Sequence, residues 1–121
     1  MSFSLLVLAA RPGASDAEVR AMAGACLGPG HREGELDERI VSFYESLRGR
    51  FPDFLPYGAD TPWMDTPLAV GIDHVGMQLS FSDRSRAALE LIDQLARRYR
   101  LHIYDPQGDE LKRPEDASVS W

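Results

Sequence analysis

Three histidines and one cysteine have the widest chemical range of all side chains in this chain, and their spacing limits what they could do. They are His31, His74, His102 and Cys26. A zinc site usually shows ligands at a short fixed spacing, such as two histidines four positions apart on one helix. No pair here has that spacing. A single cysteine also forms no internal disulfide and no cysteine-type metal site. The sequence therefore predicts neither a metal ion nor a cofactor.

General acid–base chemistry needs a base and a group that orients it, and two pairs could supply them. Asp73 directly precedes His74, and His102 stands three positions before Asp105. Turn hydrogen bonding explains Asp73 and strand packing explains His102, so we favour structural roles. His74 and His102 remain the catalytic candidates of an alternative, enzymatic interpretation. Cys26 stands among alanines, where a small buried hydrophobic residue is expected rather than a reactive thiol.

The stretch between Arg50 and Arg84 holds no lysine or arginine. It contains five aspartates interleaved with aromatic residues, namely Asp53, Asp60, Asp65, Asp73, Asp83, Phe54, Tyr57 and Trp63. Rigid aromatic side chains beside charge are typical of protein-binding surfaces. The alternative is that the aromatic residues complete the core while the aspartates are solvated. Residues 52–67 show no period of 2 or 3.6, and a loop of this length in a compact domain is often functional.

A second cluster is Tyr104-Asp105-Pro106-Gln107-Gly108. Its simplest interpretation is a turn, in which the aspartate accepts a backbone amide, proline fixes φ and glycine permits positive φ. Acidic residues accumulate after it, at positions 109, 110, 115 and 116. We expect a docking surface for a basic protein partner, formed by Asp60, Trp63, Asp65, Tyr104, Asp105 and Gln107.

Length and charge narrow the class of protein. The 121 residues correspond to one domain. The 13 basic and 19 acidic residues give a net charge of −6, which repels a nucleic-acid backbone and favours a cationic partner. The apolar run at residues 3–10 is shorter than the ~20 residues of a membrane span. A secretory signal would require a basic residue before the apolar run, and none precedes it. We therefore expect a cytoplasmic protein without membrane contact.

The elements that must position these residues follow from hydrophobic periodicity. Residues 3–10 are apolar on both faces of an extended chain, which predicts a central strand. Ser15 and Glu18 fit a capping box, so a helix begins there and ends at Gly28-Pro29-Gly30. A second helix is predicted over residues 35–51. The next predicted elements are two strands, at 68–72 and 75–81. A helix from Ser82 or Asp83 to residue 100 and a strand at 101–104 complete the domain.

This element order predicts an α+β fold. Treating the two early helices as one crossover gives β-α-β-β-α-β, a ferredoxin-like plan with a four-stranded antiparallel sheet and helices on one face. The first and third strands are expected inside the sheet. The other face is then polar, covered by residues 52–67 and the tail, or an interface through which a homodimer could form. The domain is expected to span residues 1–111, followed by a polar tail at 112–121.

Two resemblances arise from these segments. The opening Met-Ser-Phe-Ser-Leu-Leu-Val, Pro62-Trp63, Pro67-Leu68 and the Leu101-x-x-Tyr-Asp-Pro-Gln segment resemble a group of small bacterial proteins, commonest in actinobacteria. Some of these look like immunity proteins that neutralise a toxin. This sequence has Arg100 where the group often shows glycine. Separately, residues 5–22 are similar to the start of dimeric α+β barrel proteins, which include small monooxygenases and isomerases.

The sequence thus supports two functions of different classes. The first is a non-enzymatic, acidic inhibitor or immunity-type module. The alternative is a small enzyme of the dimeric barrel type, whose two sheets enclose an apolar pocket with His74 or His102 as general base. A cavity on the open sheet face, lined by histidine and aromatic residues, would favour the enzyme. A packed or flat face with an acidic rim would favour the binding module.

Overall fold

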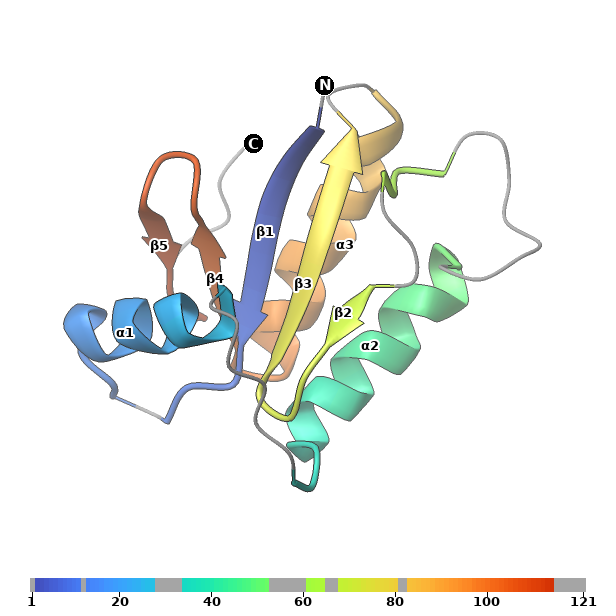
Figure 1. Cartoon of the computed structure of the whole chain (residues 1–121). Coiled ribbons are helices and arrows are strands. Elements are labelled where there is room, and N and C mark those ends of the chain that lie inside the picture. Colours follow the sequence, from blue (N-terminus) through green and yellow to red (C-terminus); the bar gives the residue numbers. More distant parts are fainter. Residues whose placement is uncertain are drawn as a thin grey trace.

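The protein folds into an antiparallel sheet with helices on both sides (Figure 1). The structure, a computed structural model, describes residues 2–11, 13–27, 34–52, 61–64, 68–80 and 83–114. Its strands are β1 (Ser2–Leu8), β2 (Ala69–Val70), β3 (His74–Ser80), β4 (His102–Asp105) and β5 (Glu110–Lys112). Its helices are α1 (Asp16–Leu27), α2 (Glu38–Arg50) and α3 (Arg84–Arg98). No helix within these ranges is long and apolar enough to cross a membrane.

The strand order is β2-β3-β1-β4-β5, and every neighbouring pair is antiparallel. The α+β class and the interior positions of β1 and β3 are confirmed. The prediction of four strands is wrong, because the described chain adds β5 beside β4. Three residues are too short to show a period of 2, so β5 left no pattern in the sequence. Strand β5 ends at Lys112, the first residue of the segment predicted to be a polar tail.

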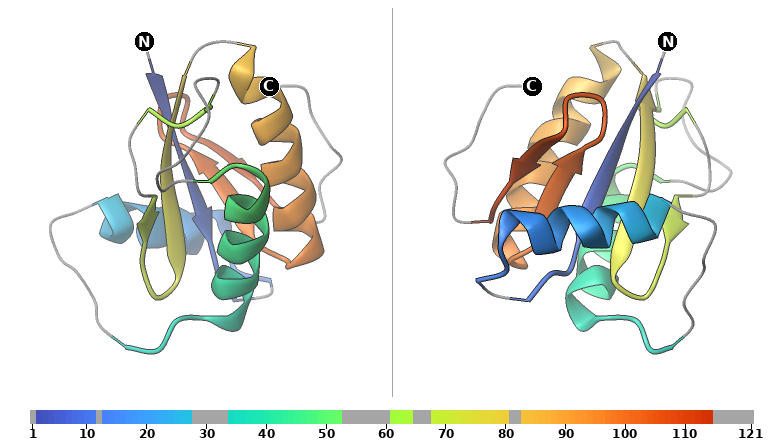
Figure 2. Two further views of the ribbon diagram at one scale, coloured as in Figure 1. Left: turned by 90° about the vertical axis from the view of Figure 1, so that its right-hand side faces the viewer. Right: turned by 60° about the vertical axis from the view of Figure 1, so that its left-hand side comes forward.

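The prediction that the helices share one face is wrong. Helices α2 and α3 cover one face, whereas α1 lies across the other (Figures 1 and 2). Side chains alternate along β1. Leu5 and Val7 pack into the larger core with α2 and α3, and Leu6 and Leu8 pack into a smaller core with α1. Because both faces of β1 are apolar, each face needs a cover, and α1 provides the second one.

The helix caps agree in part with the sequence. The Glu18 amide donates to Ser15 Oγ at 3.2 Å, as the capping box predicts. The Glu18 carboxylate instead accepts from the Arg11 guanidinium at 2.6 Å, and this hydrogen bond lowers the pKa of Glu18. Helix α2 begins at Glu38 and not near residue 35, because the side chain of Asp37 caps it by accepting the Arg39 amide at 2.8 Å.

The end of α3 contains a backbone position suited to glycine. Arg100 has a φ of 58°, in the left-handed region that L side chains rarely adopt. The next amide, that of Leu101, donates to the carbonyl of Ala96 at 2.7 Å and closes the helix before β4 begins.

Candidate functional site

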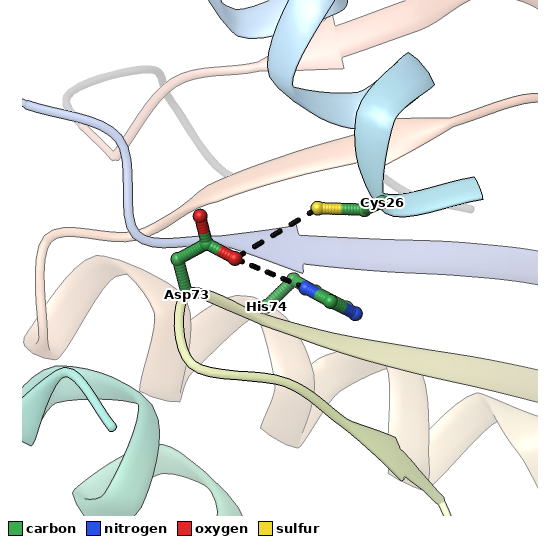
Figure 3. Close-up of side chains that lie close together, drawn as sticks. All are labelled: Cys26, Asp73 and His74. Carbon is green, nitrogen blue, oxygen red and sulfur yellow. Dashed lines mark hydrogen bonds and ion pairs between the residues drawn. The ribbon is translucent and has the colours of Figure 1, made fainter. Parts of the chain in front are cut away.

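Three chemically active side chains meet at one end of the sheet (Figure 3). Cys26 comes from the last turn of α1, Asp73 from the turn after β2, and His74 from the start of β3. Asp73 Oδ1 lies 3.1 Å from His74 Nδ1 and 3.9 Å from Cys26 Sγ. One sulfur, oxygen or nitrogen atom from each residue lies within 4.8 Å of the other two. The Asp73 and His74 side chains are each 18% exposed, so the cluster is partly desolvated but open to small solutes.

Backbone hydrogen bonds hold the turn that carries this cluster. The Gly71 amide donates to the His74 carbonyl, and the Ala9 amide donates to the Asp73 carbonyl, both at 2.8 Å. The Asp37 amide donates to the Ile72 carbonyl at 2.7 Å, which fixes the turn to the start of α2. Asp73 and His74 therefore lie in a hydrogen-bonded turn region, where the sequence placed them. The sequence did not reveal that α1 brings Cys26 to them, because 47 positions separate Cys26 from Asp73.

Glycine at position 71 leaves the space that the His74 ring occupies. A Cβ atom at Gly71 would lie 2.1 Å from His74 Cε1 and 2.6 Å from Nδ1. Both distances are far below van der Waals contact, so the ring would have to move. Glycine at position 71 is therefore required for His74 to occupy this place beside Asp73.

We expect Gly71→Ala to displace the His74 ring and to destabilise the fold by about 1–3 kcal/mol, because the added methyl group overpacks a closed turn. Urea unfolding measures the stability, and the histidine ring signals in NMR spectra report the displacement. Gly24→Ala is the matched control, since a Cβ at Gly24 on α1 meets nothing within 4 Å. Unchanged His74 signals in Gly71→Ala would contradict the steric argument.

A half-open pocket of about 230 Å³ adjoins the cluster. Cys26 and His74 line one end, and the half-buried residues Ser4, Gly76 and Gln78 of β1 and β3 line the rest together with apolar neighbours. No aromatic residue is among its described lining residues. The pocket therefore meets half of the criterion set for an enzyme: it has a histidine but no aromatic wall. In addition, α1 covers part of the face that a dimeric barrel would have to leave open.

His102 does not join this cluster. Both His74 and His102 are register partners of Leu8, so they lie on the same face with the β1 strand between them. Two strand spacings separate them by about 10 Å. His102 is 3% exposed under α1. Asp105 lies three residues further along β4 and hence on the opposite face, so the possible His102–Asp105 pair of the enzymatic alternative does not form.

The predicted docking residues near the C-terminus hold the β4–β5 hairpin against β1. The Ser4 amide donates to Gln107 Oε1 at 2.7 Å, and Gln107 Nε2 donates to the Ser4 carbonyl at 2.9 Å. The side-chain amide of Gln107 thus takes the place of a backbone peptide and continues the pairing of β1 with β4. Asp105 Oδ1 accepts the Gln107 amide at 2.9 Å, as the turn interpretation predicts.

Tyr104 links the same hairpin to α1 through Asp109. The Tyr104 hydroxyl donates to Asp109 Oδ1 at 2.7 Å, and Arg20 Nε donates to the same oxygen at 3.1 Å. The pKa of Asp109 is lowered chiefly by the hydrogen bond from Tyr104 and secondly by the one from Arg20. The hydrogen bond between Tyr104 and Asp109 also raises the pKa of Tyr104. Asp109 adopts a φ of 51° at the tight end of the turn.

The structure describes the predicted loop at residues 52–67 only in part. Trp63 is 4% exposed, belongs to the larger core, and donates its indole N–H to the Phe51 carbonyl at 2.8 Å. It is a core residue and not a surface residue. Asp60 and Asp65 lie outside the described residues, as do Asp53, Phe54 and Tyr57.

Two aspartates of the lysine- and arginine-free stretch lie at opposite ends of β3. Asp73 precedes the strand and Asp83 follows it, and the 7 residues of β3 that lie between them span about 23 Å. The Asp83 carboxylate faces the Arg86 guanidinium at 3.8 Å. These two side chains therefore do not contribute to one continuous negative surface.

Comparisons with protein-family models, curated proteins and solved structures found no match to this chain.

Proposed function

We propose that this chain is a non-enzymatic protein-binding module, an inhibitor or immunity-type protein that binds a basic partner. The observation that carries the proposal is the hairpin surface, defined here as Tyr104, Asp105, Gln107, Asp109 and Glu110 on β4, β5 and their turn. It combines fixed geometry with negative charge, and these two properties support recognition of a cationic protein.

The geometry of the hairpin surface is held before any partner arrives. Gln107 is bonded twice to Ser4 of β1, and Asp109 is bonded to both Tyr104 and Arg20. A surface that is already ordered loses less conformational entropy on binding. Affinity for a partner is therefore not reduced by the cost of ordering this turn.

The charge of the hairpin surface is negative. Its carboxylates are Asp105, Asp109 and Glu110, and Arg20 compensates only Asp109. The neighbouring basic residues are engaged elsewhere: Lys112 is paired with Asp93 inside the fold, and Arg113 with Asp16 on α1. A negative surface accelerates encounter with a cationic partner. Asp60 and Asp65 remain part of the proposed interface, whereas buried Trp63 does not.

The experiment uses a candidate basic toxin as the probe. We expect association that weakens strongly with salt, and we expect Glu110→Lys to weaken it by roughly 10-fold at low salt, because it places a like charge opposite the partner. Biolayer interferometry at low and high salt measures both effects. Glu90→Lys, a charge reversal at another exposed position, on α3, is the control. Salt-insensitive binding, or equal losses in both variants, would contradict the proposal.

A second candidate function is a small enzyme that uses His74 as general base. The contact of His74 with Asp73 beside the pocket favours it, because a carboxylate can orient an imidazole for proton transfer. His102 is excluded from direct contact with the same substrate by its burial and its distance from His74. If this function holds, His74→Ala removes turnover of a substrate found by screening, whereas Glu110→Lys leaves it intact.

We also propose a finer classification of the fold. The segment order β2-β3-β1-β4 with wholly antiparallel pairing corresponds to a ferredoxin-like core, to which this chain adds α1 and β5. The additions cover the second face and extend the β4 edge, and both support the hairpin surface.

A further inference from the structure

The cluster formed by Cys26, Asp73 and His74 has no part in the proposed protein-binding function and calls for its own explanation. Its three side chains come from three different segments and converge with a sulfur, an oxygen and a nitrogen atom within 4.8 Å of one another. Figure 3 shows one carboxylate oxygen of Asp73 facing both the Cys26 sulfur and the His74 ring. We propose that these residues bind a zinc-type transition-metal ion.

The distances suit such an ion. Tetrahedral zinc binds nitrogen and oxygen at about 2.0–2.2 Å and sulfur at about 2.3 Å, which places neighbouring ligand atoms roughly 3.3–3.8 Å apart. The observed separations are 3.1 Å from Asp73 Oδ1 to His74 Nδ1 and 3.9 Å from Asp73 Oδ1 to Cys26 Sγ. Shifts of a few tenths of an ångström bring these two pairs to ligating separations. The third pair, the Cys26 sulfur and a His74 ring nitrogen, lies within 4.8 Å, and side-chain rotation would bring it closer.

The chemistry of the three donors selects the class of metal. Calcium and magnesium prefer shells made of oxygen, whereas a thiolate and an imidazole together favour zinc and its transition-metal neighbours. A thiolate beside a carboxylate places two negative charges together, which a divalent cation between them neutralises. The same pairing makes a free thiolate nucleophile at Cys26 unfavourable, so metal binding explains the group better than thiol catalysis.

The surroundings restrain two ligands and leave one position open. Gly71 leaves room for the His74 ring at this place, and the bond from the Ala9 amide to the Asp73 carbonyl fixes that backbone. Cys26 and His74 both line the half-open pocket, so the fourth coordination position would face it. Three protein ligands with one exchangeable water or small anion is the arrangement of an open zinc site. A bound ion would also join the end of α1 to the sheet.

The test is a titration of the reduced, full-length protein with Zn²⁺ and with Co²⁺. We expect one ion per chain and a sulfur-to-cobalt charge-transfer absorption, which requires a thiolate ligand. Cys26→Ser should abolish this absorption, and Asp73→Asn and His74→Gln should each weaken binding at least 10-fold, since losing even a supporting residue costs about 10- to 100-fold. Zn²⁺ should raise the melting temperature of the wild type but not of Cys26→Ser.

Asp83→Asn is the control, since this carboxylate is exposed at the far end of β3. It should bind Co²⁺ as the wild type does. Circular dichroism establishes that each variant is folded before titration. The proposal is overturned if the wild type binds no metal, or if Asp73→Asn and His74→Gln retain wild-type affinity while only Cys26→Ser loses it. Failure here leaves the hairpin surface untouched, because Glu110→Lys tests that surface separately.

Discussion

Asp93→Ala is expected to destabilise the protein by about 3–5 kcal/mol, because it leaves a buried ammonium group without its carboxylate. Asp93 on α3 and Lys112 on β5 are 5% and 8% exposed, and their side chains form an ion pair across the edge of the sheet. Water reaches neither group well enough to replace the lost partner. For a domain with a total stability of about 5–15 kcal/mol, this is a large fraction.

The companion variants separate the charge effect from packing. Lys112→Met should cost less than Asp93→Ala, since the Asp93 carboxylate keeps Arg97 at 3.9 Å and the methionine stem replaces the lysine methylenes. The double variant Asp93→Leu with Lys112→Met should recover most of the lost stability, because an apolar pair leaves no buried charge. Urea unfolding of the three proteins measures these differences. Equal losses in the double variant and in Asp93→Ala would show that packing, and not charge, dominates.

Phe43→Ala is expected to cost about 3–5 kcal/mol, because it removes a large side chain from the centre of the larger core. Phe43 is fully buried where α2 faces α3 and the sheet. The neighbouring helix and sheet are held by their own contacts and cannot collapse fully into the space, so a cavity remains.

Val41→Ala is the matched control on the same helix. Val41 is 43% exposed, and its truncation should change stability by no more than about 0.5 kcal/mol. Thermal or urea unfolding of both variants gives the comparison. Similar losses at the two positions would mean that α2 does not present the face described here to the core.

The failure to foresee the cluster of Cys26, Asp73 and His74 has a physical origin. Spacing motifs detect ligands that share one helix or one loop, whereas these three come from α1, a turn and β3. Cys26 was expected to be a small hydrophobic residue because it is on the apolar side of α1, and Met22 and Ala23 beside it do pack into the smaller core. Cys26 also packs against that core, and its position in the last turn of α1 brings its sulfur beside the turn that carries Asp73.

The positions of Gln107 and Trp63 were also beyond what local sequence patterns can predict. The turn pattern gave no reason for a glutamine at 107, because its partner Ser4 lies 103 positions away. The composition around Trp63 suggested a surface, yet its short bridge to Leu79 directs the indole into the core. Both side chains are assigned by long-range contacts that composition and local periodicity do not report.

The sequence pattern alone predicted the α+β class, the helices and strands with clear periods, and the interior positions of β1 and β3 in the sheet. It could do so because hydrophobic periodicity and chain-breaking residues act over a few neighbouring positions. Tertiary structure alone decided that α1 covers the second face, that β5 joins the sheet, and that a thiol, a carboxylate and an imidazole come together. These outcomes depend on which distant apolar surfaces bury one another. The free energy of that burial is a property of the assembled fold and not of any single segment.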